Sequence, residues 1–84
     1  MSNVHSMVTR RKIKALDKDI RDLTEVTTVL KTAMQGLGKY THYSNIRNRV
    51  NDMFVFYTEI KHAKDKKLEI LQRLKNEQSQ ELDG

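Results

Sequence analysis

Large apolar residues recur at alternating three- and four-residue steps through the first half of the chain. The row begins at Ile13, ends at Leu37 and has one polar member, Thr27. Steps of three and four place side chains along one face of an α-helix, and their alternation is typical of coiled-coil packing. The pattern therefore predicts a first helix over residues 9–37.

Two glycines close to each other, Gly36 and Gly38, follow this row. Glycine adopts the left-handed conformation of a helix C-terminal cap without steric cost, so either residue can end the first helix. Residues 38–43 then form a turn. The alternating apolar spacing resumes at Ile46, which predicts a second helix over residues 44–79.

A basic stretch, residues 61–67, interrupts the apolar row of the second helix. Two structures fit this interruption: one continuous helix with a polar middle, or a break near 62–65 that gives a third helix. Residues 45–80 contain no glycine or proline, which favours the continuous helix. The polar end of the chain, residues 80–84, is expected to fray.

The whole chain, residues 1–84, is expected to form one small all-α domain, a hairpin of two long antiparallel helices. A two-helix hairpin buries only one side of each helix, and the four successive apolar residues 54–57 cover most of a helix circumference. We therefore expect the hairpin to dimerise or form a larger helical bundle, or to bind another protein. The alternative is a monomeric three-helix bundle. The predicted protein interface consists of Leu16, Leu23, Leu30, Met53, Phe54, Phe56 and Tyr57.

Composition excludes several classes of protein and site. The chain has no cysteine, 32% of its residues are charged, and its longest uncharged apolar run, residues 53–57, is far shorter than the ~20 residues of a membrane span. No signal peptide is visible, so a cytoplasmic location is the default expectation. The three histidines are far apart and have no partner ligands at helical spacing. We therefore expect no metal, no cofactor and no catalytic residue.

Positive charge is concentrated in two segments, residues 10–21 and 61–67, which together carry more than the net charge of +5 of the whole chain. If the chain folds back at residues 38–43, Lys14 faces Lys67, and the two segments meet at the end away from the turn. Such a patch attracts polyanions, although basic helix faces are often simply solvated. The candidate polyanion-binding residues are Arg10, Arg11, Lys14, Lys18, Lys61, Lys64 and Lys67.

Two segments show resemblances to known families. Residues 10–20, Arg-Arg-Lys-Ile-Lys-Ala-Leu-Asp-Lys-Asp-Ile, resemble the opening of the first helix of all-helical chorismate mutases, which implies an enzyme for a dicarboxylate substrate. The position of that family's second arginine is Thr27 here, so the guanidinium pair that would hold the substrate is missing. Residues 46–51 are similar to a segment of small basic bacteriocin immunity proteins, which are antiparallel helical bundles.

These observations predict a non-enzymatic helical protein that acts by self-association and protein–protein interaction, as an adaptor, inhibitor or assembly factor. The alternative is a nucleic-acid-binding accessory protein that uses the two basic segments. All five aromatic residues lie between positions 40 and 57, remote from those segments, so bases would have no rings to stack on there.

Overall fold

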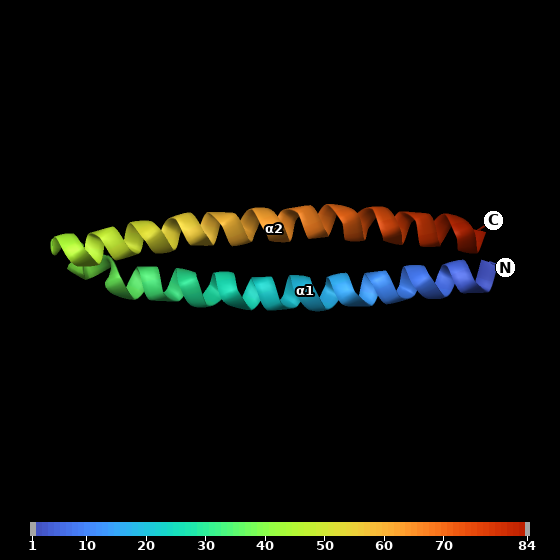
Figure 1. The fold of residues 1–84 in the computed structure, drawn as a ribbon, viewed down its shortest axis with the longest axis horizontal. Coiled ribbons are helices and arrows are strands. Elements are labelled where there is room, and N and C mark those ends of the chain that lie inside the picture. The colour runs from blue at the N-terminus through green and yellow to red at the C-terminus, as the bar shows by residue number, and fades with distance from the viewer. Residues whose placement is uncertain (1, 84) are drawn as a thin grey trace.

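Two long helices make up the computed structural model, which describes the backbone of residues 2–83 and the side chains of residues 7–78. Helix α1 is Ser2–Leu37, the 3-10 turn η1 is Gly38–Tyr40, and helix α2 is Ser44–Asp83. The helices lie side by side and antiparallel, so both chain ends lie at the end opposite the turn (Figure 1). The molecule is a rod of 62 × 14 × 14 Å. The predicted all-α helical hairpin is confirmed.

Both helices are longer than their apolar rows predict. Helix α1 begins at Ser2 rather than at residue 9, and α2 continues to Asp83, so residues 80–83 are helical where fraying was expected; Gly84 lies outside the described residues. Helix α2 also passes through 62–65 without a break. Neither extension contains a glycine or proline, and their polar residues retain helix propensity.

The turn does not use the left-handed glycine cap that the sequence suggested. No glycine among the described residues has a positive φ, and Leu37 and Thr41, which flank η1, are both right-handed helical. The chain instead tightens into a 3-10 turn, and after it the Tyr43 N–H donates to the Tyr40 carbonyl at 3.1 Å. Glycine permits a left-handed residue but does not require one.

The boundary between the helices follows the alternating spacing over most of the hairpin. Its half-buried members on α1 are Ile13, Leu16, Ile20, Leu23, Thr27, Leu30, Met34 and Leu37. On α2 the row continues through the basic stretch, where Lys64 and Lys67 take the seam positions between Ile60 and Leu71. Among the described side chains only Leu71 and Thr9 are classed as buried, at 7% and 9% exposure. One hairpin therefore leaves most side chains of its apolar seam partly exposed to solvent.

The contact made by Lys67 differs from the predicted pairing with Lys14. The Lys67 Nζ lies 3.2 Å from Oδ2 of Asp19, which is closer to the turn than Lys14. Side chains on a helix lean toward its N-terminus, and the N-terminus of α2 is at the turn, so Lys67 reaches in that direction. The two basic segments therefore do meet, but along the body of the hairpin, because α1 and α2 both continue beyond them.

Candidate interaction surfaces

Five of the seven residues predicted for the protein interface lie in the seam of the hairpin itself. These half-buried side chains are Leu16, Leu23, Leu30, Met53 and Tyr57. Because they face the neighbouring helix of the same chain, their first role is to hold α1 against α2. The other two, Phe54 and Phe56, lie outside the seam and are 59% and 47% exposed.

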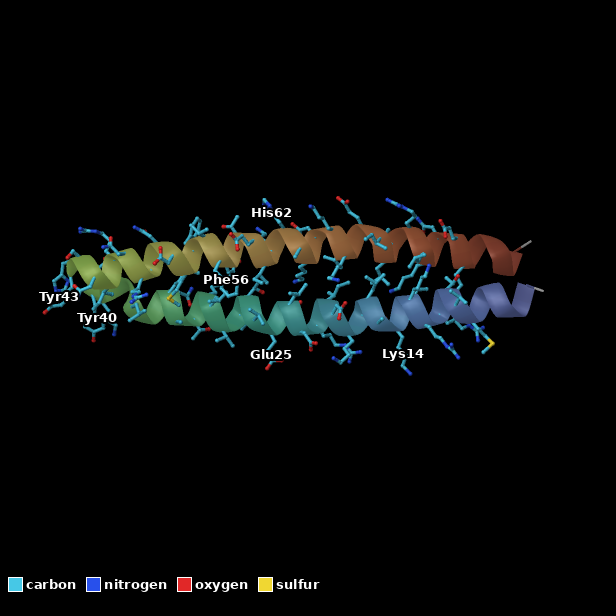
Figure 2. The ribbon with its side chains drawn as sticks, in the orientation of Figure 1. Lys14, Glu25, Tyr40, Tyr43, Phe56 and His62 are labelled. Atoms are coloured by element: carbon cyan, nitrogen blue, oxygen red, sulfur yellow. The ribbon has the colours of Figure 1, made fainter. Side chains whose placement is uncertain are left out.

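Phe56 borders an apolar groove between the two helices. Val26, Val29 and Leu30 of α1 line this groove together with Phe56 of α2, and the volume is about 430 Å³. Asp22 and Glu25 form its polar border. In Figure 2, Phe56 lies over the boundary between α1 and α2. The groove therefore combines apolar walls with an acidic edge.

The apolar surface beside this groove extends along α2 toward the open end of the hairpin. Ala63 and Ile70 follow Phe56 at seven-residue intervals, and seven residues are two helical turns, so the three share one side of α2. We call the surface made by Val26, Val29, Phe56, Ala63 and Ile70 the Phe56 face. Sequence reasoning did not assign Val29 or Ile70 to a site, although the seven-residue repeat from Phe56 was a readable signal.

The opposite side of α2 carries a different repeat, which we call the Phe54 face. It consists of Arg47, Phe54, Lys61, Leu68 and Lys75, again seven residues apart. Phe54 and Leu68 are exposed, and so are the three cations between and around them. This side is therefore both apolar and strongly basic.

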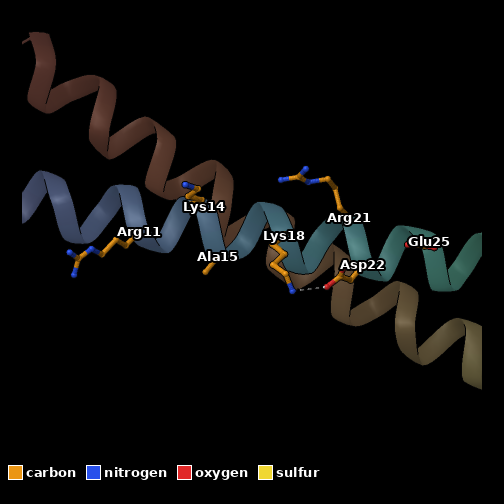
Figure 3. A pocket seen from close by; sticks show the side chains of 7 residues that line it. All are labelled: Arg11, Lys14, Ala15, Lys18, Arg21, Asp22 and Glu25. Carbon is orange, nitrogen blue, oxygen red and sulfur yellow. Dashed lines mark hydrogen bonds and ion pairs between the residues drawn. The ribbon is translucent and has the colours of Figure 1, made fainter.

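The seven candidate polyanion-binding residues do not form a single surface. Arg11, Lys14 and Lys18 line one shallow groove along α1, with Ala15, Arg21, Asp22 and Glu25 (Figure 3). Lys18 is also paired with Asp22, at 3.4 Å between Nζ and Oδ2.

The remaining four candidates are dispersed. Lys64 and Lys67 are half-buried in the seam, and Lys67 is paired with Asp19. Arg10 is exposed on α1, and Lys61 is exposed on the Phe54 face of α2. The structure therefore brings three of the candidates together on α1 and uses two others inside the hairpin.

The turn presents an exposed aromatic cluster. Tyr40 and Tyr43 are 45% and 55% exposed, and the rings of His42 and Tyr43 are 4.2 Å apart, tilted by 40° (Figure 2). Within the described residues, no group of three or more histidine and acidic side chains is arranged to hold a metal ion. No helix in that part of the chain is long and apolar enough to cross a membrane.

Comparison with known proteins returned no family model, no curated protein and no solved structure that matches this chain.

Proposed function

We propose that this protein is a non-enzymatic helical component that acts by self-association and protein–protein interaction. The observation that supports this proposal is the amount of surface that one hairpin leaves exposed. The accessible surface is 6798 Å², whereas a compact protein of this mass exposes about 5,200 Å². The excess is about 1,600 Å² per chain, roughly twice what each partner buries in a standard protein interface.

The exposed surface also has the composition of an interface. Large apolar side chains that remain more than one third exposed occur along both helices and at the turn. They are Met7, Val8, Val26, Val29, Tyr40, Tyr43, Phe54, Val55, Phe56, Leu68 and Ile70. Exposed apolar groups that lie together mark interaction sites, and aromatic residues are enriched at interfaces. Association of two hairpins into a four-helix bundle would cover part of this surface.

The dependence of thermal stability on protein concentration tests this proposal. Folding coupled to dimerisation gains about 1.4 kcal/mol per dimer for each tenfold rise in concentration. For a dimer of this size, that gain corresponds to an increase in Tm of about 3–6 °C between ~20 and ~200 µM. Circular dichroism at 222 nm measures the melting. A cooperative transition whose Tm is the same at both concentrations contradicts the self-association part of the proposal.

A second candidate function is polyanion binding, which the groove along α1 favours. Arg11, Lys14, Lys18 and Arg21 lie along one face of this helix and line the same groove. A row of cations on one helix face can contact the phosphates of a nucleic acid without reading its bases, so binding would be weak and unspecific.

Fluorescence anisotropy with a labelled DNA duplex at ~50 and ~200 mM salt tests this second candidate. Replacing Arg11, Lys14 and Lys18 by glutamine should weaken binding, and the affinity of the unchanged protein should fall steeply as salt rises. The matched control replaces Lys31, Lys39 and Lys75, which lie outside the groove. Equal losses in the two triple variants would show attraction by net charge alone and would refute a site on α1.

A further inference from the structure

Charged side chains form an ordered row beside the apolar repeat of α2. Asp52, Glu59, Lys66 and Arg73 are spaced seven residues apart and are all exposed. Each of the first three precedes a member of the Phe56, Ala63, Ile70 repeat by four residues, so the charged row lies directly beside the apolar one. The order along the row is two acids and then two bases. No ion pair joins any of the four to another side chain among residues 7–78.

We propose that α2 packs against α2 of a second copy of this chain, antiparallel and across a two-fold axis that passes at Ala63. This inference rests on the proposed function and specifies its surface and geometry. A two-fold axis at Ala63 brings Phe56 of one chain against Ile70 of the other, because these residues are equally distant from Ala63 on either side. The small Ala63 side chain lets the two helices approach closely at the axis.

The same axis brings the acids in the charged row of one chain to the bases in the charged row of the other. Glu59 of one chain lies within one residue of level with Lys66 of the other, and Asp52 is placed in the same way beside Arg73, so the dimer gains each of these pairs twice. A parallel arrangement forms neither of these pairs, because it sets each residue level with its own copy in the second chain. Charge order therefore favours the antiparallel dimer over the parallel one.

Helix α1 has its charges in the same order along the hairpin as α2, with acids nearer the turn and bases nearer the open end. Asp22 and Glu25 border the groove toward the turn, whereas Arg11 and Lys14 lie toward the open end. In the antiparallel dimer, the acidic border of each hairpin comes to the basic end of the other. The groove of Val26, Val29 and Phe56 then faces the end that carries Ile70 of the second copy.

The Phe54 face cannot form the equivalent contact. A two-fold axis that sets its exposed apolar residues, Phe54 and Leu68, against each other passes at Lys61, so two Lys61 ammonium groups would meet. The same axis would place Arg47 opposite Lys75. Like charges at each of these places oppose self-association, so this side of α2 stays exposed in the dimer.

Disulfide trapping tests the position of the axis, because the chain has no cysteine of its own. Ala63→Cys places one thiol at the axis, within bridging distance of its copy. His62→Cys is the matched control, since His62 is exposed on the side of α2 turned away from α1 (Figure 2). After oxidation with diamide we expect a linked dimer for Ala63→Cys and mainly monomer for His62→Cys on a non-reducing gel. Linking of both variants to the same extent overturns the proposal.

A mixture of two further variants tests the direction of packing. Phe56→Cys and Ile70→Cys, one of them carrying a tag that changes its mass, should form the mixed dimer in preference to either linked homodimer. Helicity from circular dichroism confirms that each variant is folded. Preferential linking of Phe56→Cys to itself would indicate parallel packing and would overturn the proposal.

Charge reversal provides a test without cysteine. Glu59→Lys or Lys66→Glu alone turns two attractive pairs of the dimer into repulsive ones, so each should weaken dimerisation about tenfold. An equimolar mixture of the two variants restores attraction at both pairs and should recover the affinity. Glu69→Lys, an exposed control on α2, should leave it nearly unchanged. Absence of recovery in the mixture refutes the pairing of Glu59 with Lys66.

Failure of this geometry can be distinguished from failure of the proposed function. If the unchanged chain remains monomeric, the proposed self-association and this inference are both wrong. If the unchanged chain dimerises but Ala63→Cys does not link in preference to His62→Cys, the proposed function stands and the axis at Ala63 is wrong.

Discussion

Two leucines on the same helix, Leu71 and Leu68, should respond very differently to truncation. Leu71 is 7% exposed and is the one buried apolar side chain of residues 7–78, whereas Leu68 is 40% exposed. Truncating a buried leucine to alanine costs at least about 2 kcal/mol, because transfer energy is lost and a cavity remains. Leu68→Ala loses only part of the transfer energy and leaves no cavity, so we expect a cost of about 0.5–1 kcal/mol.

The difference between the two variants should be about 1.5 kcal/mol, or roughly 6–12 °C in Tm for a domain of this size. Helix propensity changes equally in both, so it cancels from the comparison. Melting followed by circular dichroism at one fixed protein concentration measures the difference. Equal destabilisation by Leu71→Ala and Leu68→Ala would refute the assignment of Leu71 to the seam and of Leu68 to the exposed side.

Three further predictions concern the turn, the seam and the exposed side of α2. Gly36→Ala should stabilise the protein by about 0.5–1 kcal/mol in thermal melts. Gly36 is inside α1 and has no positive φ, and a Cβ added there meets no atom within 4 Å. A loss of stability would contradict the right-handed backbone at this end of α1. A double-mutant cycle of Asp19→Ala and Lys67→Ala should give a coupling energy of about 0.2–1 kcal/mol. This energy should decrease as salt rises, because the two side chains are partly exposed, at 48% and 36%. A coupling energy of zero would show that the pair does not stabilise the hairpin. Val55→Glu should leave the concentration dependence of melting unchanged, while Phe56→Glu should abolish it, although Val55 is the more exposed of the two.

The alternating apolar spacing was sufficient to predict the hairpin and most of its seam. Ile13, Leu30 and Met53, for example, are half-buried where that spacing places them. A period of three and four residues is a direct consequence of helix geometry, so it can be read without knowledge of the partner helix. The absence of glycine and proline from residues 45–80 likewise favoured the unbroken α2 that the structure has.

Lysines at seam positions were harder to predict. Lys64 and Lys67 continue the spacing, but their charge made the stretch 61–67 resemble a solvated face or a break. A lysine can lay its aliphatic stem along a seam while its ammonium group reaches water or an acid, as Lys67 does with Asp19. The tilt of these long side chains also explains why a register counted from the turn missed this pair.

The division of the exposed surface could not be predicted from residue type alone. Phe54 and Phe56 look equivalent in the sequence, and both were predicted to be in an interface. Their surroundings separate them, because Phe56 lines a groove with Val26 and Val29 while Phe54 belongs to a basic row. Whether either residue binds a partner stays a prediction.

Sedimentation equilibrium tests self-association most directly. At tens of micromolar protein, the account predicts a species of twice the 9.9 kDa mass of one chain, or a larger multiple of it, in exchange with monomer on dilution. Glu59→Lys and Lys66→Glu should each shift that equilibrium toward monomer, and their mixture should shift it back. A folded 9.9 kDa monomer at every concentration would contradict the central claim.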